Sequence, residues 1–241
     1  MLLADEAVVR YRIGTSGFSY KEWKGSFYPE DLPDKKMLPY YAERLDAVEI
    51  NNTFYRMPTR ALLEGWTAQV PEEFAFALKT PRRITHQKKL AGVEEDMAYL
   101  LETAGALGSR LGPLLVQLPP YLKKDVPLLR DFVALVPPGA RAAVEFRSSS
   151  WFEDDVYEAL ESGGLALVVS DMDDKPEPPV EATAPFGYAR LRRAEYDDRA
   201  MERWAKRFAD AGWSDAYVFF KHEEAGAGPR YAARFRELVP A

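Results

Sequence analysis

Short apolar runs alternate with longer amphipathic stretches along the whole chain. The short runs are rich in β-branched and aromatic residues, as strands are, whereas the longer stretches repeat apolar residues every three to four positions, as helices do. We predict strands at residues 8–14, around 48–51, and at 74–79, 114–118, 142–147, 165–171, 186–192 and 216–222. We predict helices at about 35–45, 58–70, 94–107, 126–136, 151–161, 198–211 and 226–239.

This order of elements predicts the fold. Eight strands, each followed by a helix or by a loop in its place, are typical of an α/β protein built as a single (β/α)8 TIM-like barrel. No linker, change of composition or short repeat divides the chain, so we expect one domain over residues 1–241. The Pro-rich, acidic segment 172–185 is expected to have little regular structure.

The second predicted strand carries the first sign of chemistry. Val48 and Ile50 suit a buried strand face, while Glu49 and Asn51 alternate with them and share the other face. A carboxylate inside a buried strand is uncommon. In a closed parallel barrel, Glu49 would point inward near the carboxyl ends of the strands, where barrel enzymes keep their catalytic groups. Alternatively, Glu49 is a structural carboxylate paired with a neighbouring Arg or Lys.

Polar side chains also stand near the ends of the other predicted strands. Barrel geometry would bring them to one mouth although they are spread along the chain. The candidates for catalysis are Glu49, Glu145 and Asp171, and the candidates for substrate binding are Ser16, Asn51, Tyr55, Lys79, His86, Gln117, Arg147, Arg192, Lys221 and His222.

Positive charges outnumber the three carboxylates in this set. Such a pocket suits an anion such as phosphate, which Arg binds in bidentate fashion and Lys as a point charge. The carboxylates could then act as general base or hold Mg²⁺ or Mn²⁺. The alternative is that Glu49, Lys79, Glu145 and Arg147 neutralise one another inside the barrel.

Composition excludes several classes of protein. Hydrophobic residues make up 47% of the 241 residues, the formal net charge is −6 and the pI is about 5.2, which argues against a generally basic nucleic-acid-binding protein. There is no Cys and there are two His, so thiolate catalysis and a multi-His zinc centre are excluded. No stretch approaches the about 20 apolar residues of a membrane span. We expect a cytoplasmic protein without membrane contact.

Several motifs resemble the YecE-like family, catalogued as domain of unknown function 72. They are Ile13–Tyr20, Phe27–Pro29, Val48–Asn51 with Thr53–Tyr55, Lys79–Pro81 with Ile84–His86, Gln117–Pro120, and Val144–Arg147 with Ser150–Phe152. The resemblance implies a barrel related in shape to endonuclease IV and sugar isomerases, and implies no activity. The chain departs from the family at two places: it has Leu191–Arg193 where many members have Leu-His-Gly, and Phe220–Glu224 where many have a Phe-Asn-Asn-Asp-like motif. Cations stand at both places.

From these observations we expect a hydrolase that acts on a phosphorylated or phosphodiester substrate. The competing expectation is a non-catalytic barrel that binds nucleic acid or a partner, helped by the basic run Arg82–Lys89. A third possibility is a glycosidase with Glu49 and Glu145 as its acid/base pair, which requires a narrow range of carboxylate separations.

Overall fold

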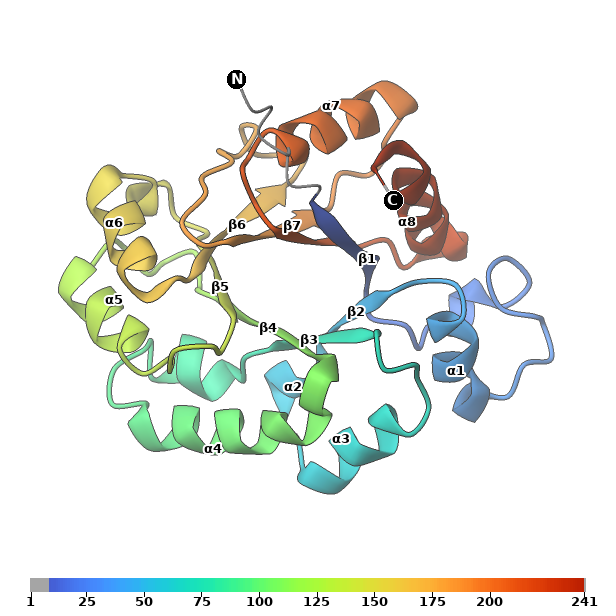
Figure 1. The fold of residues 1–241 in the computed structure, drawn as a ribbon, viewed down its shortest axis with the longest axis horizontal. Helices are drawn as coiled ribbons and strands as arrows, with labels where there is room; N and C mark the ends of the chain where they lie inside the picture. Colours follow the sequence, from blue (N-terminus) through green and yellow to red (C-terminus); the bar gives the residue numbers. More distant parts are fainter. Residues whose placement is uncertain (1–8, 241) are drawn as a thin grey trace, which may run out of the picture.

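In the computed structural model, which describes residues 9–240, eight parallel strands close into a barrel in the order β1 to β8 (Figure 1). The predicted (β/α)8 fold is therefore confirmed. The strands are β1 (Arg10–Ser16), β2 (Ala47–Ile50), β3 (Ala75–Lys79), β4 (Leu111–Gln117), β5 (Ala142–Glu145), β6 (Ala166–Asp171), β7 (Phe186–Leu191) and β8 (Asp215–Phe220). The first strand was predicted to begin at Val8, which lies outside the described residues.

Helices surround the barrel (Figure 1). They are α1 (Met37–Ala42), α2 (Asn52–Tyr55), α3 (Arg60–Thr67), α4 (Glu94–Ala104), α5 (Val126–Val133), α6 (Asp154–Gly163), α7 (Asp198–Ala209) and α8 (Ala227–Leu238). Three of them begin at a side-chain cap, where Thr59, Asp125 and Asp197 accept a hydrogen bond from the backbone N–H three residues ahead. The predicted helices were generally longer than the observed ones because their terminal residues lie in turns.

Different strands supply the small and the large side chains of the barrel interior. Strands β2, β3 and β5 present alanines there, such as Ala47, Ala77 and Ala143, while β7 and β8 present Tyr188 and Phe219. The rings of Tyr188 and Phe219 lie 5.2 Å apart. Alanine on one side of a closed barrel leaves room for aromatic rings from the other side.

The amino-terminal end of the barrel carries an ion-pair cluster that lines a cavity of about 310 Å³. Asp215 accepts from Arg10 Nε at 2.7 Å and from Arg141 Nη2 at 3.0 Å. Tyr217 extends the cluster by accepting from Arg141 at 2.8 Å. The carboxyl ends of the strands, called the barrel mouth below, carry the remaining polar cluster. Among residues 9–240, no helix is both long and apolar enough to cross a membrane.

Candidate active site at the barrel mouth

Arg190, on β7, lies at the centre of the polar cluster and is only 2% exposed. Its Nη2 donates to Glu49 Oε1 at 2.8 Å, and its Nη1 donates to Glu145 Oε2 at 2.6 Å. Burial lowers the pKa of Arg190, but the two carboxylates outweigh this effect and hold its pKa above the ordinary value. Glu49, Arg190 and Glu145, called the buried triad below, therefore join β2, β7 and β5 across the barrel.

Glu49 is saturated by donors. In addition to Arg190, the hydroxyl of Tyr188 donates to Oε2 at 2.8 Å and the hydroxyl of Ser16 donates to Oε1. Asn51 Nδ2 in turn donates to Ser16 Oγ at 2.8 Å. Burial would raise the pKa of Glu49, but the charge of Arg190 and these hydrogen bonds hold its pKa below the ordinary value. Glu49 is thus a fixed anion, as the structural alternative anticipated.

Glu145 has the same character. Its Oε1 lies 2.6 Å from Arg147 Nε and 3.6 Å from Arg192 Nη1, and accepts from Ser170 Oγ at 3.1 Å. The Arg147 contact is a close ion pair without the alignment of a hydrogen bond. Burial opposes ionisation, but the charges of Arg190, Arg147 and Arg192 lower the pKa of Glu145 to about 2.

Two lysines at the mouth remain without a carboxylate at ion-pair distance among residues 9–240. Lys79 Nζ lies 4.3 Å from the centroid of the Phe54 ring, a cation–π contact. Burial, followed by the charge of Arg190, lowers the pKa of Lys79 to about 8. Burial and the charges of Arg192 and Arg190 also lower the pKa of Lys221. Lys221 and Arg192 line a cavity of about 470 Å³, so both are accessible to a small ligand.

The mouth therefore carries surplus positive charge. The cations are Lys79, Arg147, Arg190, Arg192 and Lys221, and the anions are Glu49, Glu145 and, in the cavity beside Lys221, Glu223. Five cations facing three carboxylates leave a formal excess of two positive charges. Burial, followed by the charge of Arg190, lowers even the pKa of Arg192 to about 10. Such a site is stabilised by an added anion.

The expectation that Asp171 joins the inward carboxylates was wrong. Asp171 is the last residue of β6, and its side chain faces the helices while that of Ser170 faces the barrel interior. Asp171 accepts from Arg193 Nε at 2.7 Å, from the Tyr196 hydroxyl at 2.9 Å and from Trp204 Nε1 at 3.2 Å. It joins α7 and the segment after β7 to the outside of the barrel.

We accordingly predict a structural phenotype for Asp171. The Asp171→Ala variant should lose about 2–3 kcal/mol of unfolding free energy in urea, because the Tyr196 and Trp204 donors lose their buried acceptor. Phosphate binding at the mouth should not change. Asp131→Ala on the exposed face of α5 is the matched control. If the folded Asp171→Ala variant did not bind phosphate, Asp171 would belong to the binding site after all.

The remaining candidates divide into two groups. Gln117 lies at the mouth, with Oε1 3.4 Å from Arg190 Nη1, and His86 packs edge-on against Phe54 at 5.0 Å. His86 also lies close enough to Lys79 that, after burial, this charge lowers its pKa. Tyr55 does not join them, because its side chain is 71% exposed on α2. His222 lines the same cavity as Lys221 and Arg192, while its ring packs against Tyr231 at 4.9 Å and contacts the Arg193 carbonyl.

Sequence reasoning missed Arg190 and Tyr188, two of the most central residues. The signal was the alternation in β7, where Tyr188, Arg190 and Arg192 occupy every second position and therefore share one face. Only the last of the three was selected, because it stood at the predicted strand end.

The arrangement of the carboxylates argues against a metal site and against glycoside hydrolysis. Within the described part of the chain, no group of three or more His, Asp or Glu could hold a metal ion. Arg190 lies between Glu49 and Glu145, and Asp171 points away from both. A glycosidase needs one carboxyl group that is protonated near neutral pH, whereas the pKa of both glutamates is lowered. The carboxylates fit neither role.

Comparisons with known proteins agree with the fold. A family model described as "Protein of unknown function DUF72" matches residues 12–241. The chain is 28% identical to UPF0759 protein YecE of Escherichia coli (strain K12), over 63% of the chain and 56% of YecE, just over half its length. It is 25% identical to UPF0759 protein YunF of Bacillus subtilis (strain 168), over 88% and 78% of the two chains. The crystal structure of a DUF72 family protein from Thermotoga maritima matches with a TM-score of 0.84 at 28% identity, covering 95% of this chain and 98% of the other.

Proposed function

The chain belongs to the DUF72 family of proteins of unknown function, and we propose that its barrel mouth binds and hydrolyses a phosphorylated or phosphodiester small molecule. The observation that carries the proposal is the surplus of cations around two carboxylates that Arg190 already bridges. Arg147, Arg192 and Lys221 would hold the phosphoryl oxygens. Guanidinium groups match oxyanions in bidentate fashion, and fixed charges stabilise the transition state without reorganisation.

Lys79 is the candidate general base. With a pKa of about 8, about a tenth of its amine is neutral at pH 7. The neutral amine takes a proton from the attacking water as the new P–O bond forms, and the bond from phosphorus to the leaving group breaks. The products are the phosphoryl group bearing the water oxygen and the leaving alcohol, which takes its proton from solvent. The neighbouring charge of Arg190 favours the neutral amine needed at the start.

Two other functions have less support. The basic run Arg82–Lys89 was a candidate for nucleic-acid binding, but Arg83 and Lys88 both pair with Asp96 at 2.8 Å. Two of its charges are therefore partly neutralised within the protein. Metal-assisted hydrolysis by Mg²⁺ or Mn²⁺ would require carboxylates free to coordinate, whereas Glu49 and Glu145 are engaged with Arg190.

Anion binding should depend on pH through Lys79. Sulfate keeps its charge between pH 7 and pH 10, so any change in its affinity comes from the protein. Because the pKa of Lys79 is about 8 in the free protein, its positive charge is present below pH 8 and lost above it. Sulfate affinity measured by calorimetry should fall as pH rises from 7 to 9. An affinity that is constant over this range would exclude Lys79 as a binding charge.

The hydrolytic proposal is tested with 4-nitrophenyl phosphate and bis(4-nitrophenyl) phosphate, whose product is coloured. We expect turnover of at least one of them in the presence of EDTA, competitively inhibited by inorganic phosphate. Turnover that requires added Mg²⁺ or Mn²⁺ would contradict the metal-free mechanism. Phosphate binding without turnover of any phosphoester would instead support the non-catalytic alternative.

A further inference from the structure

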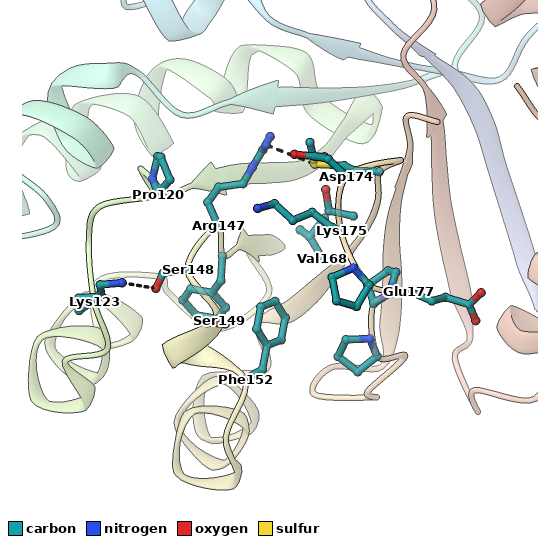
Figure 2. A pocket seen from close by; sticks show the side chains of 16 residues that line it. Pro120, Lys123, Arg147, Ser148, Ser149, Phe152, Val168, Asp174, Lys175 and Glu177 are labelled. Carbon is teal, nitrogen blue, oxygen red and sulfur yellow. Dashed lines mark hydrogen bonds between the residues drawn. The ribbon is translucent and has the colours of Figure 1, made fainter. Parts of the chain in front are cut away.

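A cavity of about 640 Å³ lies beside the barrel mouth, between the ends of β5 and β6 and the connection that follows β6 (Figure 2). Cavities of roughly 300–1,000 Å³ are typical of sites that enclose small organic ligands. A phosphate ion alone would fill only a small part of this space. The size of the cavity therefore indicates a ligand with a body larger than its anionic group.

One wall of the cavity is continuous with the buried triad. Arg147 and Ser170 both line the cavity, and both contact Glu145 Oε1, at 2.6 Å and 3.1 Å. Arg147 Nη1 also lies 3.5 Å from the sulfur of Met172, another lining residue. A ligand with its anionic group against Arg147 would therefore have its remaining atoms inside the cavity.

The opposite walls combine apolar side chains with three charged residues of the connection after β6, Asp174, Lys175 and Glu177. Phe152 and Val168 line the cavity from the barrel side, and Pro176, Pro178 and Pro179 line it from the connection after β6. Figure 2 shows the Phe152 ring projecting into this space and Lys175 crossing it from the other side. The Phe152 ring packs edge-on against Phe146, another lining residue, with ring centroids 6.4 Å apart and an interplanar angle of 82°.

We propose that this cavity binds a flat apolar group, such as an aromatic ring, that is attached through a short link to the phosphoryl group of the ligand. The inference rests on the proposed function, since Arg147 is placed in both sites. The Phe152 ring and the rigid prolines offer flat apolar surfaces between which a ring loses its contact with water. The ligand class is thus an aryl or similarly apolar phosphate ester, rather than inorganic phosphate or a short alkyl phosphate.

The test compares the affinities of three probes measured by calorimetry: inorganic phosphate, methyl phosphate and 1-naphthyl phosphate. The wild-type protein should bind 1-naphthyl phosphate at least about tenfold more tightly than methyl phosphate, the range expected for filling an apolar pocket. The Phe152→Ala variant should lose most of this preference and keep its affinity for methyl phosphate. Phe152→Leu repeats the test with a smaller change in packing in case Phe152→Ala does not fold.

The matched control is Tyr99→Ala, which removes an exposed ring on α4, away from the cavity. It should keep the full preference. Equal affinities of the wild type for 1-naphthyl and methyl phosphate would overturn the inference and leave the proposed phosphate site intact. A preference that survives in both Phe152 variants would also overturn it. Absence of binding by all three phosphates would instead overturn the proposed function.

Discussion

Replacing Arg190 with methionine should lower the free energy of unfolding by at least about 3–5 kcal/mol, the cost of breaking one buried ion pair. The variant leaves Glu49 and Glu145 both fully buried without their shared cation. Since a whole domain is stable by only about 5–15 kcal/mol, the loss should be evident in a urea titration as a large shift of the midpoint.

A triple variant separates the loss of charge pairing from the loss of packing. Glu49→Gln and Glu145→Gln, added to Arg190→Met, remove both carboxylate charges that Arg190 bridges, of which Glu145 alone keeps a second close cation, Arg147, while keeping side-chain volume. This variant should recover much of the lost stability. Arg130→Met, on the exposed face of α5, is the matched control and should have little effect. If Arg190→Met cost less than about 1 kcal/mol, the value typical of an exposed pair, the buried triad would not organise the mouth.

Replacing Lys79 with methionine should reduce phosphoester turnover by about 10²–10⁴-fold, the usual contribution of a general base. The same substitution should leave the melting temperature unchanged or raise it. The amine is desolvated beside Arg190 and has no carboxylate at ion-pair distance within the described residues, so its charge costs stability. A residue that lowers stability while supporting turnover is typical of a functional site.

The turnover rate of the wild type should rise with pH and level off above a pKa of about 8, because the Lys79 amine becomes neutral there. Lys35→Met, at an exposed position before α1, is the matched control for removing a lysine. The assignment fails if Lys79→Met retains turnover with an unchanged pH profile. It also fails if Lys79→Met unfolds the protein, because a purely structural role would then explain the lysine.

The fold was predictable from sequence because each strand and helix has its own recognisable period of apolar and polar residues. Period-two alternation in β2 separated Val48 and Ile50 from Glu49 and placed this carboxylate inside the barrel. The same rule failed for β6, which is apolar on both faces, so nothing in the segment indicated that Ser170 faces inward and Asp171 outward.

The role of Arg190 could not be predicted from β7 alone, because it depends on packing against other strands. On β3 the small residues Ala75 and Ala77 face inward, whereas Gly187 and Ala189 of β7 face outward. Gly187 packs under Trp213, and the interior space left by alanines on other strands is filled by Tyr188 and Arg190. Complementarity across a closed barrel involves strands far apart in sequence, so no single strand reveals it.

The central claim is that surplus positive charge at the barrel mouth forms a site for a phosphoryl group. Calorimetric titration of inorganic phosphate into the wild type and into Lys221→Met at low salt tests it most directly. We predict binding in the millimolar range or tighter for the wild type, weakened in Lys221→Met and by added salt, and unchanged in Lys35→Met. Absence of phosphate binding to the wild type at millimolar concentrations, or equal binding to Lys221→Met, would contradict the claim.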